Sequence, residues 1–160
     1  KADALAYGLT GPNLRGSGVG LDLRKDKPYS GYENYEFDVV TKDTCDVYGR
    51  FLIRIEEMEQ SLRIVEQCLD RLQPGAIMPE KMPRMLRTPP GEVYIRTEAP
   101  RGEFGCYVVS DGTNRPWRVH MRAPGLFACQ ALHKFVVGGM IADVIAVIGS
   151  LDVVMGDVDR

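Results

Sequence analysis

The longest regular pattern of apolar and polar positions lies between Val47 and Leu72. Apolar residues recur there at alternating intervals of three and four, and charged residues fill many of the positions between them. That spacing predicts one long α-helix with an apolar face. Asp43 or Thr44 can cap its start, and the Pro74–Gly75 pair ends it. Such a helix spans about 40 Å, a length that favours a place in a helix bundle.

Three shorter stretches alternate apolar and polar residues in the manner of β-strands. Turn-forming Gly, Pro, Asp and Asn residues separate them, and they run over Val93–Glu98, Gly105–Ser110 and Trp117–Arg122. We expect these stretches to form a small antiparallel meander. A further short strand is expected at Tyr35–Val40.

The pattern returns to a helical period after Pro124. Two helical stretches, residues 125–136 and 140–151, flank a Gly138–Gly139 break. The segment from Pro74 to Gly91 contains five prolines and three methionines, and we expect it to be an irregular connection. Helices together with an antiparallel meander predict an α+β fold.

Composition and charge limit the class of protein. The 160 residues suffice for one domain with its own core. A net charge of −2 provides no field that would favour nucleic acid or an anionic membrane surface. The uncharged part of the apolar C-terminal stretch, Val144–Leu151, is far shorter than the ~20 residues of a membrane span. Four widely spaced cysteines without a CxxC pair predict reduced thiols in the cytosol, with a secreted two-disulfide domain as the alternative.

The glycine-rich stretch near the N-terminus does not match a nucleotide-binding loop. Gly11, Gly16 and Ser17 fit part of the phosphate-loop spacing, but the lysine of that motif is absent. The dinucleotide fingerprint fails as well, because Leu21 stands where a glycine is needed. We therefore expect these glycines to provide positive φ angles and close backbone packing.

A basic stripe lies on the last predicted strand. Arg118, His120 and Arg122 share one face by the period of two. The stripe could hold an anion or a partner subunit, or be an ordinary solvated face, and we expect its side chains to face solvent or a neighbouring subunit. His120 and His133 are the only histidines and lack the spacing of a metal site, so we expect no metal ligand here.

The C-terminal tail, "GSLDVVMGDVDR", spaces Asp152, Asp157 and Asp159 among apolar residues before Arg160. This composition indicates a partly buried tail rather than an expendable one. Buried carboxylates need cations or hydrogen-bond donors. We therefore expect Arg160 and the terminal carboxylate to be held in place.

Several long stretches resemble one family in the same order along the chain. They are "LTGPNLRGSG", "DLRKDKPYSGYENYEFDV", "RFLIRIEEMEQSLRIVEQCL", "EAPRGEFGCYVVSDGTNRPWRVHMRAPG" and "GGMIADVIAVIGSLDVVMGDVDR". They resemble the C-terminal half of the 49-kilodalton subunit of NADH:quinone oxidoreductase, respiratory complex I. The resemblance implies that residues 1–160 are the C-terminal part of one hydrogenase-large-subunit-like domain whose N-terminal half is absent.

The resemblance also implies candidate site residues in the tail. In nickel–iron hydrogenases the tail closes the active-site cavity and supplies a cysteine pair, at positions that correspond here to Val154 and Asp157. Without thiolates such a centre cannot be held, and in the complex I family the cavity receives the quinone headgroup. The implied quinone-cavity residues are Asp152, Val154, Asp159 and Arg160, with Val154 against the ring and Asp159 holding Arg160.

The resemblance implies part of a multisubunit, proton-translocating enzyme that uses NAD and a quinone such as ubiquinone. Electrons would pass to quinone from an iron–sulfur cluster in the adjacent subunit. No catalytic residue, metal or cofactor is expected in this chain. The implied partners are the cluster-bearing subunit and the membrane subunit of the quinone channel. The implied location is peripheral, on the cytoplasmic side of the cell inner membrane.

Two departures from the family leave alternatives open. The N-terminal half, with the family's headgroup-binding histidine and tyrosine, is absent, so we expect no activity from the fragment alone. The region from Leu72 to Pro89 is shorter than in typical respiratory members, which leaves the electron donor open. The alternatives are the large subunit of a membrane-bound nickel–iron hydrogenase, a related oxidoreductase with another donor, and a non-catalytic scaffold.

Overall fold

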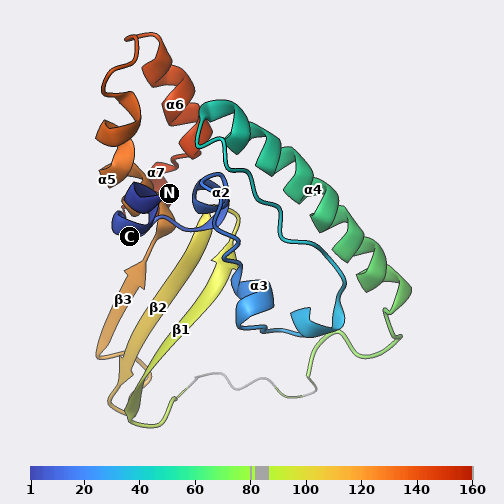
Figure 1. Cartoon of the computed structure of the whole chain (residues 1–160). Coiled ribbons are helices and arrows are strands. Elements are labelled where there is room, and N and C mark those ends of the chain that lie inside the picture. The colour runs from blue at the N-terminus through green and yellow to red at the C-terminus, as the bar shows by residue number, and fades with distance from the viewer. Residues whose placement is uncertain (80, 82–86, 160) are drawn as a thin grey trace.

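The computed structural model describes residues 1–79, 81 and 87–159. A long helix, α4 (Val47–Asp70), and a three-stranded sheet diverge like the two sides of a wedge (Figure 1). Most of the short N-terminal segments lie between them, whereas the first lies beside the C-terminal helices, which gather where the two sides meet (Figure 1). The short segments are α1 (Ala2–Ala6), α2 (Gly11–Arg15), α3 (Leu23–Asp26) and the 3-10 helix η1 (Tyr32–Asn34). Helices and an antiparallel sheet together confirm the α+β class.

Helix α4 matches the predicted helix, but its cap differs. The N-cap is Asp46, whose carboxylate accepts a hydrogen bond of 2.6 Å from the amide of Gly49. The expectation that Asp43 or Thr44 caps the helix was therefore wrong by two or three residues. The hydroxyl of Thr44 instead donates a hydrogen bond to Asp46 Oδ1 at 2.9 Å. The helix ends at Asp70, ahead of the proline that was expected to stop it.

The apolar face of α4 points away from the rest of the chain. Phe51, Leu62 and Leu69 are 55%, 64% and 66% exposed. The opposite side packs inward, and it buries Arg50 and Ile53 against α2 and α6. In this chain the helix therefore turns a charged side inward and leaves its apolar stripe (Phe51, Ile55, Leu62, Val65 and Leu69) exposed.

The segment expected as a strand at Tyr35–Val40 is not one. Among the described residues it pairs with no strand, and it runs along α4 instead. The side chain of Gln67 bonds both the amide (2.9 Å) and the carbonyl (2.7 Å) of Glu36, and Gln60 accepts from the amide of Asp38 at 2.9 Å. The backbone groups are thus satisfied by helix side chains, so an extended sequence pattern occurs here without a sheet.

The meander is confirmed, and its strands are antiparallel in the order β1, β2, β3. The observed strands are β1 (Gly91–Ala99), β2 (Gly102–Ser110) and β3 (Arg118–Arg122). Val93, Val108 and Val119 stand in register on one face. The other face is largely polar, with Tyr94, Tyr107 and His120 in register.

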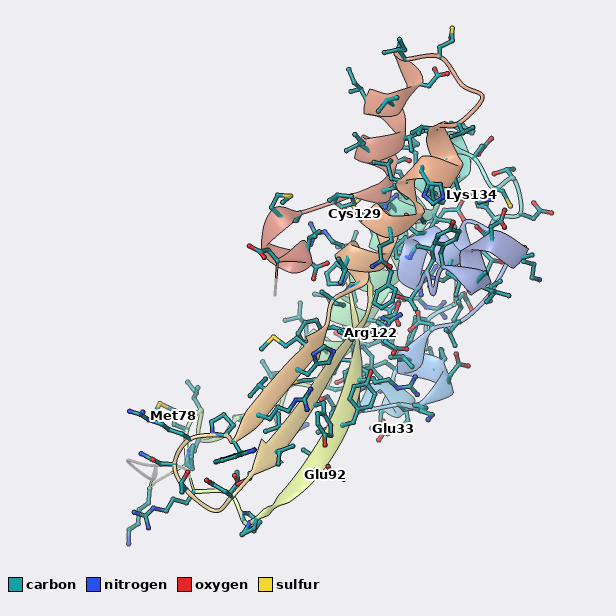
Figure 2. All side chains as sticks on the ribbon, turned by 90° about the vertical axis from the view of Figure 1, so that its left-hand side faces the viewer. Glu33, Met78, Glu92, Arg122, Cys129 and Lys134 are labelled. Atoms are coloured by element: carbon teal, nitrogen blue, oxygen red, sulfur yellow. The ribbon has the colours of Figure 1, made fainter. Side chains whose placement is uncertain are left out.

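Of the predicted basic stripe, Arg118 and His120 are exposed, but Arg122 is not free. Arg122 donates to the carbonyl of Gly8 at 2.9 Å and to that of Glu103 at 2.8 Å. Its guanidinium also lies 4.3 Å from the centre of the Phe127 ring. Arg122 sits where the sheet meets the helices (Figure 2), and the expectation that it faces solvent or a neighbouring subunit was wrong because it ties these layers together.

The small core lies between the N-terminal segments and helix α5 (Pro124–Val136). Its buried residues are Ala4, Leu9, Leu14, Ala128 and Ala131. Two further helices follow, α6 (Asp143–Leu151) and α7 (Met155–Val158). Helix α7 packs on α5, where a carboxylate oxygen of Asp157 accepts from the amide of Gly125 at 2.7 Å. Within the described part of the chain, no helix has both the length and the apolar character needed to cross a membrane.

The expected role of the N-terminal glycines is confirmed at Gly11. Its φ is +62°, and a Cβ there would lie 2.4 Å from the Cα of Gly102. Gly102, at the start of β2, has φ +130°. Two backbones meet at this point, which only glycine permits.

We expect the 160-residue chain produced alone to self-associate through the exposed stripe of α4, because large exposed apolar patches mark interfaces or aggregation sites. Leu62→Glu combined with Leu69→Glu should shift it toward monomer in sedimentation velocity. The control is Glu59→Gln, an exposed polar position on the same helix. Cooperative unfolding of an unaltered monomer would contradict this expectation.

Candidate functional site

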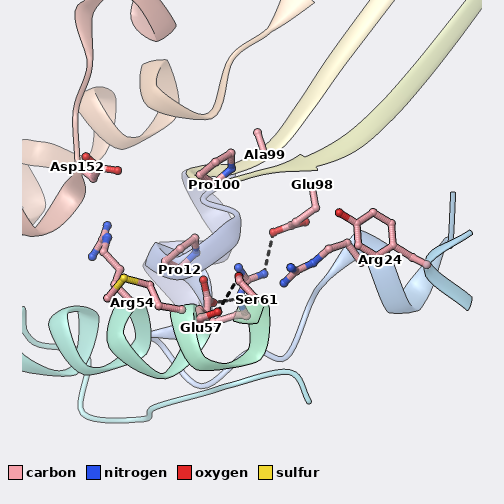
Figure 3. A pocket seen from close by; sticks show the side chains of 12 residues that line it. Pro12, Arg24, Arg54, Glu57, Ser61, Glu98, Ala99, Pro100 and Asp152 are labelled. Atoms are coloured by element: carbon pink, nitrogen blue, oxygen red, sulfur yellow. Dashed lines mark hydrogen bonds and ion pairs between the residues drawn. The ribbon is translucent and has the colours of Figure 1, made fainter. Parts of the chain in front are cut away.

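A pocket of about 470 Å³ is lined by residues from both sides of the wedge. Helices α2 and α4, the β1–β2 turn and Asp152 at the start of the tail all contribute to its lining (Figure 3). Its volume falls within the range of small-molecule sites. Apolar surface comes from Pro12, Met58 and Pro100, and several charged side chains interrupt that surface.

The centre of the charged part is Arg15, which is only 2% exposed. Its Nε donates to Glu57 Oε1 at 2.6 Å, and its Nη1 donates to Glu98 Oε1 at 2.8 Å and to the carbonyl of Leu21 at 2.9 Å. Burial alone would lower the pKa of Arg15, but the hydrogen bonds and charges of Glu57 and Glu98 outweigh burial and raise that pKa. Arg15 therefore stays a cation and joins α2, α4 and β1.

A second ion pair, between Asp22 and Arg24, adjoins this group. Arg24 Nη2 lies 2.6 Å from Asp22 Oδ2, and Arg24 Nε donates to Oδ1 at 3.0 Å. Burial would raise the pKa of Asp22, but Arg24 lowers it on balance. For Glu98 burial prevails and raises the pKa, in spite of Arg15. Of Asp22 and Glu98, it is therefore Glu98 at which burial outweighs the neighbouring cation.

Arg54, on the inner side of α4, also lines the pocket. Its Nη1 donates to the carbonyl of Arg50 at 3.0 Å, and its Nη2 donates to Asn13 Oδ1 at 3.4 Å. Burial lowers its pKa, although the charges of Asp152 and Glu57 act the other way. In Figure 3 its guanidinium rises from α4 on the side of the pocket where Asp152 lies.

Of the four predicted tail residues, the structure brings Asp152 to this pocket. Asp152 ends α6 at φ +55°, and Arg101 holds it, with Nε 2.9 Å from its carbonyl and 3.2 Å from Oδ2. Val154 is 40% exposed and is not part of the lining. Asp159 is exposed after α7, and Arg160 lies outside the described residues.

The sequence reasoning missed the charged residues that line the pocket, above all Arg15, Arg54, Glu57 and Glu98. In the sequence pattern, Arg54 and Glu57 are simply two of the charged residues that fill positions between the apolar residues of the long helix. One signal was present: Ile53 lies one turn before Glu57, and an apolar residue beside those charges suits a buried contact.

The four cysteines do not converge. They lie before α4 (Cys45), near its end (Cys68), on β2 (Cys106) and on α5 (Cys129), and all are free thiols. In the described ranges, no group of three or more His, Cys, Asp or Glu residues lies close enough together to hold a metal ion. The fold and the pocket define an α+β protein with a pocket lined by both apolar and charged side chains.

A family model described as the respiratory-chain NADH dehydrogenase 49 Kd subunit matches residues 1–86 and 80–160. The chain belongs to this family. The two matched ranges overlap at residues 80–86, within the proline-rich connection between α4 and β1.

Curated relatives agree with this family. The chain is 45% identical to the D subunit of the NADH-quinone oxidoreductase of Mycobacterium avium (strain 104) over 196 residues, covering 98% of this chain and 44% of the relative. It is 47% identical to the second D subunit of the same enzyme in Streptomyces coelicolor over 199 residues, covering 99% and 45%. The chain thus spans less than half the length of these relatives. The alignments also exceed its 160 residues, so the relatives contain residues that it lacks.

We expect Arg15→Met to destabilise the protein strongly. Glu57 and Glu98 would stay in a site largely shielded from water without their cation, and breaking a buried pair in this way costs about 3–5 kcal/mol. The measurement is thermal denaturation of the full-length subunit in its assembly. The control is Arg63→Met, since Arg63 is exposed and pairs with Asp38 at 3.1 Å, a type of contact worth about 0–1 kcal/mol. Equal stability of the two variants would contradict the central role of Arg15.

Proposed function

We propose that this chain is the C-terminal part of the quinone-site subunit of a membrane-associated, proton-translocating NADH:quinone oxidoreductase. In this proposal electrons pass to quinone from an iron–sulfur cluster of a partner subunit. The observation that carries the proposal is the family match over nearly the whole chain, together with relatives that are named as D subunits of NADH-quinone oxidoreductase.

The pocket supports the quinone part of this proposal. A quinone headgroup needs apolar surface for its ring and polar groups near its oxygens. Pro12, Met58 and Pro100 offer the first, and the charged side chains of α4 and Asp152 offer the second. Val154 and Asp159 follow Asp152 in the tail, and we propose that they extend the same wall toward surfaces that the rest of the assembly supplies.

Placement of the cluster in a partner subunit is supported by the separation of the cysteines, because clusters are held by cysteine sets. Within the proposal this chain contacts the cluster-bearing subunit and the membrane subunit of the quinone channel. NADH would be oxidised elsewhere in the complex. The proposed location is peripheral, on the cytoplasmic side of the cell membrane.

We expect Val154→Met to alter the KM for quinone and the affinity of quinone-site inhibitors in the assembled complex. The larger side chain changes the shape of the wall, at an overpacking cost of about 1–3 kcal/mol at most. Electron transfer to a water-soluble acceptor that bypasses quinone should be unchanged. Equal loss of both reactions would limit the tail to a role in assembly.

We expect Asp159→Asn to lower quinone turnover while the bypass reaction persists. The substitution keeps the volume and removes one charge, so a change reports on electrostatics rather than on shape. Asp159 is exposed in this chain, and its effect would arise from surfaces contributed by the assembly. Steady-state quinone reduction is the measurement. Unchanged rates in both assays would mean that Asp159 is an ordinary surface residue.

A further inference from the structure

Arg54 differs from the other arginines around the pocket. Arg15 is paired with Glu57 and Glu98, Arg24 with Asp22, and Arg101 with Asp152. Within residues 1–79, 81 and 87–159, no carboxylate lies at ion-pair distance from Arg54. Its hydrogen bonds there go to two neutral oxygens, the Arg50 carbonyl and the Asn13 amide.

Arg54 has more N–H donors than these two hydrogen bonds use. A guanidinium carries five N–H donors in a fixed plane, and the bond to Asn13 is long at 3.4 Å. Asp152 is near enough to favour the charge of Arg54, but Arg101 already binds the carboxylate and the carbonyl of Asp152. A ligand that enters the pocket can therefore meet a cation with donors available.

The surroundings of Arg54 select the kind of ligand. Pro12, Met58 and Pro100 bring apolar surface to the same pocket, which suits a flat ring better than a strongly hydrated anion. The carboxylates of Glu57, Glu98 and Asp152 are also there, and they disfavour a ligand that arrives with a full negative charge. A neutral ring with an electron-rich carbonyl oxygen satisfies both conditions.

We propose that Arg54 binds a carbonyl oxygen of the quinone headgroup and stabilises the negative charge which that oxygen acquires during reduction. This inference rests on the proposed function. Two electrons from the partner subunit's cluster and two protons convert the quinone to quinol, so that each C=O becomes C–OH. Arg54 keeps its own proton, since a guanidinium does not act as an acid in proteins, and both protons come from other groups or from water. Its effect is electrostatic, like that of an oxyanion-hole donor.

The test uses the full-length subunit in the assembled, membrane-bound complex. Arg54→Ala should lower quinone reduction about 100-fold, the loss typical of a removed oxyanion donor, and leave electron transfer to the bypass acceptor unchanged. Millimolar guanidinium should restore part of the quinone rate, and equal urea should not, because urea has a similar shape but no charge. The control, Arg63→Ala, removes an exposed arginine of the same helix and should change neither rate.

The outcomes separate the inference from the proposed function. An unchanged quinone rate in Arg54→Ala, or a loss that guanidinium and urea restore equally, would overturn the role of Arg54. If that variant does not assemble, Arg54→Lys retains the charge but loses the planar fork. A raised quinone KM in Arg54→Lys with normal bypass transfer supports the inference, and an unchanged KM overturns it. An unaltered complex that reduces the bypass acceptor but no quinone would overturn the proposed function itself.

Discussion

The rest of this structure depends on the ion pairs that the buried guanidinium of Arg15 makes with Glu57 and Glu98. Arg15 lies on α2 and binds one carboxylate from α4 and another from β1, so it holds the two sides of the wedge at one point. A charge removed from water in this way is tolerated only when its hydrogen bonds are complete. Among the described residues, no buried side-chain nitrogen or oxygen lacks a partner. Such a network is cooperative, because the loss of one member leaves the others unpaired.

This constraint explains the orientation of α4. Glu57 has to face inward to reach Arg15, and Arg50, Ile53 and Arg54 lie on the same side of the helix, so they face inward as well. The apolar stripe is then left on the outer side. The relatives extend well beyond the matched region and have enough additional chain to cover such a stripe. The charged network therefore fixes the pocket, and the stripe remains for packing outside this chain.

Local patterns were enough to predict α4, the three strands and the C-terminal helices, because the period of apolar residues reports directly on helix and strand. They failed where the deciding partner is distant in sequence. Glu98 lies 83 positions from Arg15, and no local pattern connects the two residues. The extended segment around Glu36 failed for a similar reason, since its partner is the side chain of Gln67 rather than another strand. The family resemblance pointed to Asp152, which lies at the pocket, but nothing in the sequence pointed to Arg54.

The tail is held at two points, and this determines what its residues can do. Asp152 ends α6 in a left-handed conformation, and Arg101 of the β1–β2 turn donates a hydrogen bond to its carbonyl. Five residues later, Asp157 binds the first turn of α5. Val154 lies between these anchors, so its position is set even though it is partly exposed and makes no wall of the pocket in this chain. The ion pair between Arg101 and Asp152 therefore has two effects. It fixes the start of the tail, and it occupies the carboxylate near Arg54, so that Arg54 has no ion-pair partner among the described residues.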